Sequence, residues 1–193
     1  FKLESAEVVK ESNEIGSIEV NEDERYINIC VGKNSYVFDK PYGRLETIRH
    51  NGIDLITEPV VLNLNRAPLD NDVPYASQWS DIGLYRLKQK TYSAVLTENT
   101  AEKAVIEVSM SMGSYTFDPA FRGKMIYTIL ADGTLLINVN GKATEGIEVL
   151  PRIGLQLTMP EGFEKFSFFG YGPHESYIDK NLSTYVDKFE TGF

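Results

Sequence analysis

The sequence predicts an all-β fold, a large antiparallel β-sandwich formed by a single domain over residues 1–193. Short segments of alternating apolar and polar residues follow one another along the chain, with turn signals between them. No helical pattern of ten or more residues interrupts them. The length suits one sandwich domain, and about a dozen predicted strands are enough for two packed sheets.

The first part of the chain is predicted to form a strand meander. The alternating runs lie at residues 17–20, 26–31, 35–39, 45–49 and 54–57. Asn51-Gly52 separates the last two and predicts a tight hairpin, because both residues tolerate positive φ. His50 is expected to be exposed beside this turn. Cys30 lies inside the second run and is expected to be a buried structural thiol.

A long irregular segment is predicted at residues 64–82, where prolines and polar residues interrupt the alternation. Loops of this length are uncommon inside compact domains and often carry function. A short helical turn is expected near residues 77–82, and another near 175–177. Alternation resumes at residues 85–97, 103–112, 123–130, 135–140, 146–159 and 165–169, and Ala131-Asp132-Gly133 predicts a further hairpin turn.

Charge and composition narrow the range of partners. The formal net charge is −9, which disfavours binding to nucleic acid or to anionic membranes. There is no apolar run long enough to span a membrane. The single cysteine forms no internal disulfide, which fits a reducing, cytoplasmic location. The chain begins at Phe1 without methionine, so we expect a piece of a longer protein.

Metal and cofactor sites have little support in the sequence. The two histidines, His50 and His174, are far apart, and no paired ligand spacing is present. Asp70-Asn71-Asp72 resembles the start of a calcium loop, but the glycine and final glutamate of that motif are missing. Local turn bonding is the favoured interpretation of these three residues. No cofactor is expected in this chain.

Two pairs of carboxylates are candidates for glycoside hydrolysis, which needs two carboxyls roughly 5–9 Å apart. Asp70 and Asp72 form one pair, and Glu175 and Asp179 form the other. With 28 acidic residues in the chain, close pairs arise by chance. Turns and salt bridges are therefore the favoured interpretation.

Aromatic residues accompany both acidic segments. Trp79 could stack on a sugar ring or fill a core, and the sequence leaves both readings open. Phe166 and Phe168 have strand spacing, which favours core packing.

Two segments carry a family resemblance. Arg66-Ala67-Pro68-Leu69-Asp70-Asn71-Asp72 is followed by Trp79 and Gly83, and Pro151-Arg152-Ile153-Gly154 leads to Gly170-Tyr171-Gly172-Pro173-His174-Glu175-Ser176-Tyr177-Ile178-Asp179-Lys180. In content, order and separation, these motifs resemble the large β-galactosidases of glycoside hydrolase family 2. The resemblance covers nearly the whole chain.

The resemblance implies an accessory role without catalysis. It maps the chain onto the start and middle of the last of five domains, the small-chain supersandwich related to galactose mutarotase, and implies truncation at the C-terminal end. The family's catalytic glutamates lie in the central barrel domain, so this chain is expected to contain no catalytic residue. The parent would be a retaining enzyme acting on terminal β-D-galactosyl residues. Its other domains would bind Mg and Na.

Partners and site residues follow from the same resemblance. The expected partners are the remaining domains, a β-galactoside at the interface and further copies in a homo-oligomer. The carbohydrate-proximal loop would contain Arg66, Asp70, Asn71, Asp72 and Trp79. Charge-assisted hydrogen bonds from Arg66 and Asp70–Asp72 would join this loop to the sandwich. The second motif contributes His174, Glu175, Tyr177 and Asp179.

Two other functions stay open at this point. One is an independent carbohydrate-binding module, suggested by aromatic residues beside acidic ones. The other is a mutarotase-like aldose epimerase, which needs a general acid and a general base in a cleft. His174 and Glu175 are its candidate groups.

Overall fold

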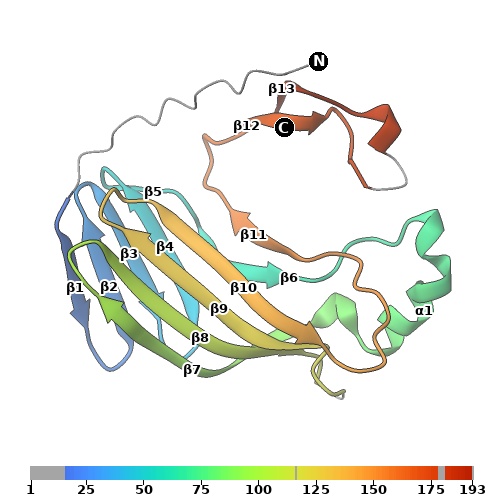
Figure 1. The fold of residues 1–193 in the computed structure, drawn as a ribbon, viewed down its shortest axis with the longest axis horizontal. Helices are drawn as coiled ribbons and strands as arrows, with labels where there is room; N and C mark the ends of the chain where they lie inside the picture. Colours follow the sequence, from blue (N-terminus) through green and yellow to red (C-terminus); the bar gives the residue numbers. More distant parts are fainter. Residues whose placement is uncertain (1–15, 116, 178–180, 193) are drawn as a thin grey trace. The chain divides into compact units, whose positions relative to one another are not determined.

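The computed structural model describes residues 16–115, 117–177 and 181–192 (Figure 1). Its chain divides into two compact units, Phe1–Thr158 and Met159–Phe193. Asp179 and Lys180 of the second motif lie outside the described residues.

The first sheet is an antiparallel meander in the order β1-β2-β3-β4-β5. At its last turn Asn51 and Gly52 have φ values of 51° and 79°, which confirms the predicted hairpin. His50 ends the preceding strand and is exposed, as expected. The strands are β1 (Ile18–Glu22), β2 (Tyr26–Val31), β3 (Asn34–Asp39), β4 (Arg44–His50) and β5 (Ile53–Asp54).

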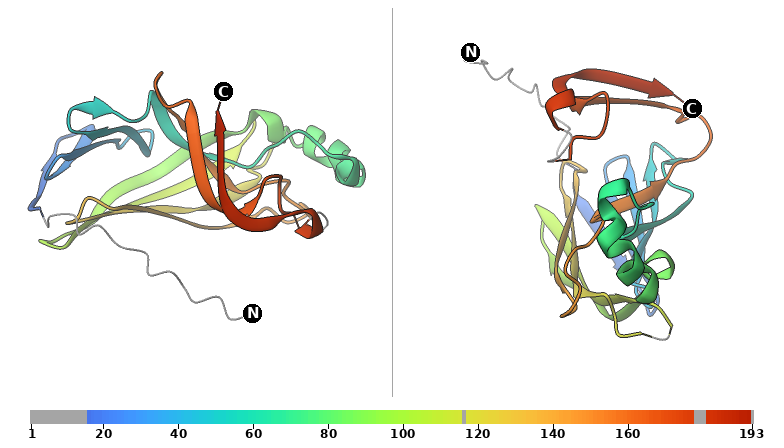
Figure 2. Two further views of the ribbon diagram at one scale, coloured as in Figure 1. Left: turned by 90° about the horizontal axis from the view of Figure 1, so that it is seen from above. Right: turned by 90° about the vertical axis from the view of Figure 1, so that its right-hand side faces the viewer.

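The second sheet is also antiparallel, in the order β10-β9-β8-β7. Its strands are β7 (Lys88–Asn99), β8 (Lys103–Gly113), β9 (Phe121–Leu130) and β10 (Leu135–Ala143). A separate pair joins β6 (Glu58–Asn63) to β11 (Gly154–Thr158). The right-hand view of Figure 2 shows the two large sheets as adjacent layers, which confirms the predicted all-β sandwich.

The core lies between these two sheets. Phe38 from β3 meets Tyr127 from β9 edge to face, with ring centroids 5.1 Å apart. Alternate residues of the central strands β2, β3, β8 and β9 point inward, as a period of two requires. The first sheet contributes Ile27, Ile29, Val31, Tyr36, Phe38 and Leu45, and the second contributes Ala104, Ile106, Val108, Met110, Met125, Tyr127 and Ile129.

Burial of Tyr127 makes the stability of the sandwich sensitive to alkaline pH. Burial raises the pKa of the Tyr127 phenol, whose hydroxyl has, among the described residues, only the sulfur of Met125 as a hydrogen-bond partner, 3.8 Å away. A raised pKa in the folded state stabilises the fold fully below the unfolded pKa of about 10, and this contribution is lost as the pH rises above it.

We therefore expect the wild type to lose about 1.4 kcal/mol more per pH unit above pH 10 than a Tyr127→Phe variant. Urea unfolding of both proteins at neutral pH and at pH 11 measures the difference, and the shared effects of other ionising groups cancel. Parallel stability profiles for the two proteins would contradict the assignment.

The Cys30 thiol is exposed, and the expectation of a buried thiol is wrong. Ile27, Ile29 and Val31 of β2 face the core, so Cys30 lies on the opposite face of the same strand. A thiol reagent should therefore label the native protein at a rate close to that of the urea-unfolded protein. A Cys30→Ser variant is the blank, since the chain has one cysteine. Protection of the native thiol over hours would contradict this exposure.

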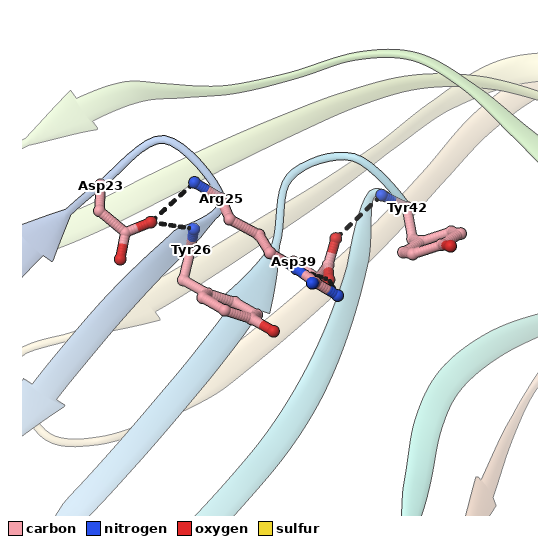
Figure 3. A network of polar contacts seen from close by, with 5 residues as sticks. All are labelled: Asp23, Arg25, Tyr26, Asp39 and Tyr42. Atoms are coloured by element: carbon pink, nitrogen blue, oxygen red, sulfur yellow. Dashed lines mark hydrogen bonds and ion pairs between the residues drawn. The ribbon is translucent and has the colours of Figure 1, made fainter.

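A polar network fixes the turns at one end of the first sheet (Figure 3). Asp39 is fully buried, and its Oδ2 accepts hydrogen bonds from Nε and Nη2 of Arg25 at 3.0 and 2.9 Å. Its Oδ1 accepts the backbone N–H of Tyr42 at 3.0 Å. Nearby, the backbone N–H groups of Tyr26 and Arg25 lower the pKa of Asp23. The charge of Asp39 is thus paired inside the fold and serves the turns.

The second unit is a two-stranded ribbon of β12 (Lys165–Gly172) and β13 (Tyr185–Gly192), with a short 3₁₀ turn η3 (Asn181–Ser183). Phe168, Phe189 and Tyr185 form a ladder of rings with centroid separations of 5.3 and 5.4 Å. Phe166 is 55% exposed, so its assignment to a core is wrong for the described residues. Two strands cannot bury both faces of a ribbon.

Other sequence-based boundaries also need correction. Strands β6 and β13 were not predicted, and the run at residues 146–159 contains a strand only at Gly154–Thr158. The helical turn near residues 175–177 is not observed. The segment before β7 contains a helix, α1 (Val73–Asp81), preceded by η1 (Asp70–Asp72) and followed by η2 (Leu84–Arg86). Of the helices in the described residues, none has the length and apolar character needed to cross a bilayer.

Candidate functional site

The candidate site is the segment that joins β6 to β7, which lies beyond one end of the sheets (Figure 1). The sequence predicted an irregular loop with a short helical turn near residues 77–82. The helical turn is confirmed, but it belongs to a nine-residue helix, α1, that begins earlier, at Val73. Pro74 lies in the first helical turn, where its missing N–H costs no hydrogen bond. Gly83 follows the helix with φ 67°, a left-handed conformation that ends it.

Arg66 and Asp72 form a clamp at the start of this segment. Arg66 Nη1 lies 2.6 Å from Asp72 Oδ2, and Arg66 Nη2 donates to Asp72 Oδ1 at 3.1 Å. Asp72 Oδ2 also accepts the backbone N–H of Leu69 at 2.7 Å. The two side chains are only 18% and 13% exposed, so this fork-to-fork pair is largely shielded from solvent. These contacts lie within the segment itself, between residues 66 and 72, whereas the sequence placed the bonds of Arg66 and Asp70–Asp72 between the loop and the sandwich.

The β6–β7 segment also forms hydrogen bonds with residues 146–151, which lie outside the strands. Arg66 Nε donates to the carbonyl of Pro151 at 2.8 Å, Trp79 Nε1 to Val149 at 2.9 Å, and Gln78 Nε2 to Gly146 at 2.8 Å. Backbone carbonyls outside a sheet need such partners when water is excluded. Three side chains of the β6–β7 segment thus fix the path of residues 146–151.

Trp79 packs inside this substructure, and its ring offers no free face to a sugar. It is 4% exposed and packs with Leu84 and Ala120, while Tyr75 stacks beside it with ring centroids 6.4 Å apart. Of the two roles that the sequence left open for Trp79, stacking on a sugar or packing in a core, the structure shows core packing. This small core is separate from the main one between the sheets.

The carboxylates of this segment have different surroundings. Asp72 is engaged through both oxygens, which suits an anchor and leaves it poorly placed to act as a general acid or base. Asp70 and Asn71 are exposed on the short turn η1. Within residues 16–115, 117–177 and 181–192, no three His, Cys, Asp or Glu side chains converge in a way that could hold a metal ion.

The second motif lies in the second unit, after β12. His174, Glu175 and Tyr177 are exposed there, and Asp179 lies outside the described residues. On the neighbouring strand Phe169 and Tyr171 are 78% and 63% exposed. These aromatic faces, unlike the ring of Trp79, are accessible.

The fold and the clamped segment define an all-β sandwich domain with a structured connection at one end. Comparison with known sequences places it more closely: residues 31–193 match the model of the beta galactosidase small chain family. The chain belongs to this family.

Similar proteins support the same assignment. The chain is 32% identical to a β-galactosidase of Staphylococcus xylosus over 188 residues, which covers 95% of this chain and 19% of that protein. It is 29% identical to the β-galactosidases of Actinobacillus pleuropneumoniae and Vibrio cholerae, covering 87% and 84% of this chain. The chain thus spans less than a fifth of the length of these relatives.

Proposed function

We propose that the chain is an accessory region of a retaining β-galactosidase that hydrolyses terminal β-D-galactosyl residues. The observation that carries this proposal is the match along 95% of the chain to one fifth of a protein named β-galactosidase. The remaining domains are its proposed partners, and they would supply the catalytic carboxylates and any Mg or Na. A homo-oligomer located in the cytoplasm is part of the same proposal.

The proposed contribution of this chain is mechanical. Substrate entrances need rigid walls, because misplacement by about 1 Å can cost 100-fold in rate. The Arg66–Asp72 clamp and the three bonds to residues 146–151 make α1 and its flanks such a rigid element. Val73, at the start of α1, and Tyr85, in η2, are 71% and 62% exposed. Their side chains are available to contact another domain or the β-galactoside.

Activity assays test this proposal. The purified chain should show no turnover of a chromogenic β-galactoside above that of a mock preparation. The whole protein should be active, should lose activity when this region is deleted, and should regain it when the chain is added in trans. Turnover that co-purifies with the isolated chain would overturn the accessory role, as would full activity of the deletion.

An independent carbohydrate-binding module is a second candidate, favoured by the exposed rings of Phe169 and Tyr171 on β12. Titration calorimetry of the chain with galactose and lactose tests it. Binding tighter than millimolar that a Tyr171→Ala variant loses would favour this function. The aldose epimerase gains no comparable support, because His174 and Glu175 are both exposed.

A further inference from the structure

A polar hollow opens in the first unit at a point where five strands and one connection meet. It has a volume of about 250 Å³, below the roughly 300–1,000 Å³ of sites for drug-sized ligands. About eight water molecules occupy this volume in liquid water, so the hollow has room for one small molecule. We call it the Arg44 pocket, and the polar residues that line it are Arg44, Asn63, Lys88, Gln89 and Gln156.

Arg44 is the unusual member of this lining. Its Nε is buried and has no hydrogen-bond partner within the described residues. Its guanidinium lies over the ring of Tyr42, 5.3 Å from the ring centre, and forms no ion pair with any described carboxylate. Buried polar groups are normally bonded, and an uncompensated charge is costly. Nε itself is closed off from solvent, but the terminal Nη1 and Nη2 atoms also form no hydrogen bond within the described residues, and Arg44 lines the pocket. These terminal N–H groups are therefore the ones that could bind an anion.

The charge of the lining has one sign. Arg44 and Lys88 are both cations, and no acidic residue is among the described residues that line the pocket. The chain as a whole has a net charge of −9, so a local pair of unopposed cations stands out against its surroundings. Arginine presents a planar fork of donors that matches a carboxylate.

The amides define the rest of the ligand. The side-chain NH₂ of Gln89 already donates to the carbonyls of Tyr42 and Gly43, which leaves its oxygen as an acceptor. The oxygen of Gln156 is 3.5 Å from Asn63 Nδ2, which leaves its NH₂ as a donor. Neighbouring donors and acceptors of this kind suit hydroxyl groups, which both donate and accept. Leu87 and Met112 supply apolar surface for C–H groups.

We propose that the Arg44 pocket binds a small polyhydroxy carboxylate of monosaccharide size. The carboxylate would bind Arg44, with Lys88 adding charge at the rim, and the hydroxyls would bind the amides of Gln89 and Gln156. This site is independent of the proposed hydrolase function, because none of its residues belongs to the clamp or to the second motif.

The test is an NMR titration of the full chain with D-galacturonate, which follows the side-chain amide signals of Asn63, Gln89 and Gln156. We expect saturable shifts at millimolar concentrations or below. D-Galactose has the same hydroxyl-bearing ring without the carboxylate, and it should shift these signals with an affinity at least roughly tenfold lower, about 1.4 kcal/mol. Equal affinity for the two sugars, or no shift with galacturonate, would overturn the proposal.

Three variants separate the pocket from non-specific attraction. Arg44→Met should weaken galacturonate binding by roughly tenfold or more, and Lys88→Gln by a few-fold. Arg122→Met removes an exposed arginine on β9 outside the pocket, and should leave the affinity unchanged. Affinity that falls equally in the Arg44 and Arg122 variants would identify a general charge effect and overturn the site.

A stability measurement checks the premise about Arg44. Its guanidinium has no hydrogen-bonded or ionic partner among the described residues and only the ring of Tyr42 beside it, so Arg44→Met should unfold at the same temperature as the wild type or a higher one. Galacturonate should raise the melting temperature of the wild type and leave that of Arg44→Met unchanged. A large fall in the melting temperature of Arg44→Met would show that Arg44 is structural, which overturns the assignment.

Discussion

Replacement of Phe38 by alanine is expected to lower the free energy of unfolding by about 3–5 kcal/mol. Phe38 is 1% exposed at the centre of the sandwich and meets Tyr127 of the opposite sheet edge to face. The truncation removes the buried ring, leaves a cavity, and breaks an aromatic contact worth about 1 kcal/mol beyond its area. Urea unfolding followed by circular dichroism measures the change in midpoint at constant slope.

Two further variants define the mechanism of this loss. Phe38→Leu keeps much of the volume and should cost clearly less than the alanine variant, because it leaves a smaller cavity. Val95→Ala shortens a side chain that is 51% exposed on β7, and should change stability by no more than about 0.5 kcal/mol. A Phe38→Ala cost similar to that of Val95→Ala would mean that the two sheets do not share one core.

The strands could be predicted because burial on one face repeats every two residues. Residues 26–31 alternate clearly, and β2 has the predicted bounds. The phase of the alternation was harder to read than its presence, since Cys30 was assigned to the wrong face. Strand β6 was missed because it opens with Glu58-Pro59, and its partner β11 lies about 90 residues further along the chain.

The sequence predicted only a short helical turn near residues 77–82, and the full length of α1 could not be predicted because local preference does not stabilise it. At nine residues it is too short to be stable alone, and its formation depends on tertiary packing. That packing comes from Trp79 against Ala120, and from a bond to the carbonyl of Val149, 70 residues away in sequence. Contacts between residues so far apart along the chain leave no pattern in the local sequence.

In the candidate site, too, contacts between residues near in sequence differ from contacts between distant ones. Charge-assisted hydrogen bonds were predicted for Arg66 and Asp70–Asp72, but between the loop and the sandwich; Arg66 and Asp72, six residues apart, pair with each other. The carbonyl of Pro151, which Arg66 also binds, is 85 residues away and carries no chemical signature in the sequence. The Arg44 pocket was missed for the same reason, because its polar residues come from four separate strands and each looks ordinary alone.

Replacement of Arg66 by methionine is expected to lower the free energy of unfolding of the β6–β7 segment by about 2–3 kcal/mol. Loss of one partner of a buried ion pair typically costs about 3–5 kcal/mol, and the residual exposure of this pair reduces that figure. The variant leaves the carboxylate of Asp72 shielded without its cation, and it leaves the carbonyl of Pro151 without its donor. Trp79 is the only tryptophan in the chain, so its fluorescence during urea unfolding reports on this segment.

A double-mutant cycle isolates the ionic part of this cost. Asp72→Asn removes the charge but keeps the shape, and it should cost about 1–2 kcal/mol because the backbone N–H of Leu69 loses a charged acceptor. The Arg66→Met/Asp72→Asn protein should be more stable than the sum of the two single changes predicts, by about 1–2 kcal/mol. Additive losses would show that the two side chains act independently.

The pair of Arg49 and Asp54 is the matched control for this cycle. It has the same chemistry and a contact of 2.8 Å, but its side chains are 45% and 50% exposed. Exposed pairs contribute about 0–1 kcal/mol because water and ions screen them. Arg49→Met should therefore cost far less than Arg66→Met, and raised salt should weaken only the exposed pair appreciably. If both arginines cost the same, solvent exclusion does not strengthen the Arg66–Asp72 clamp, and the rigid wall proposed for α1 loses its physical basis.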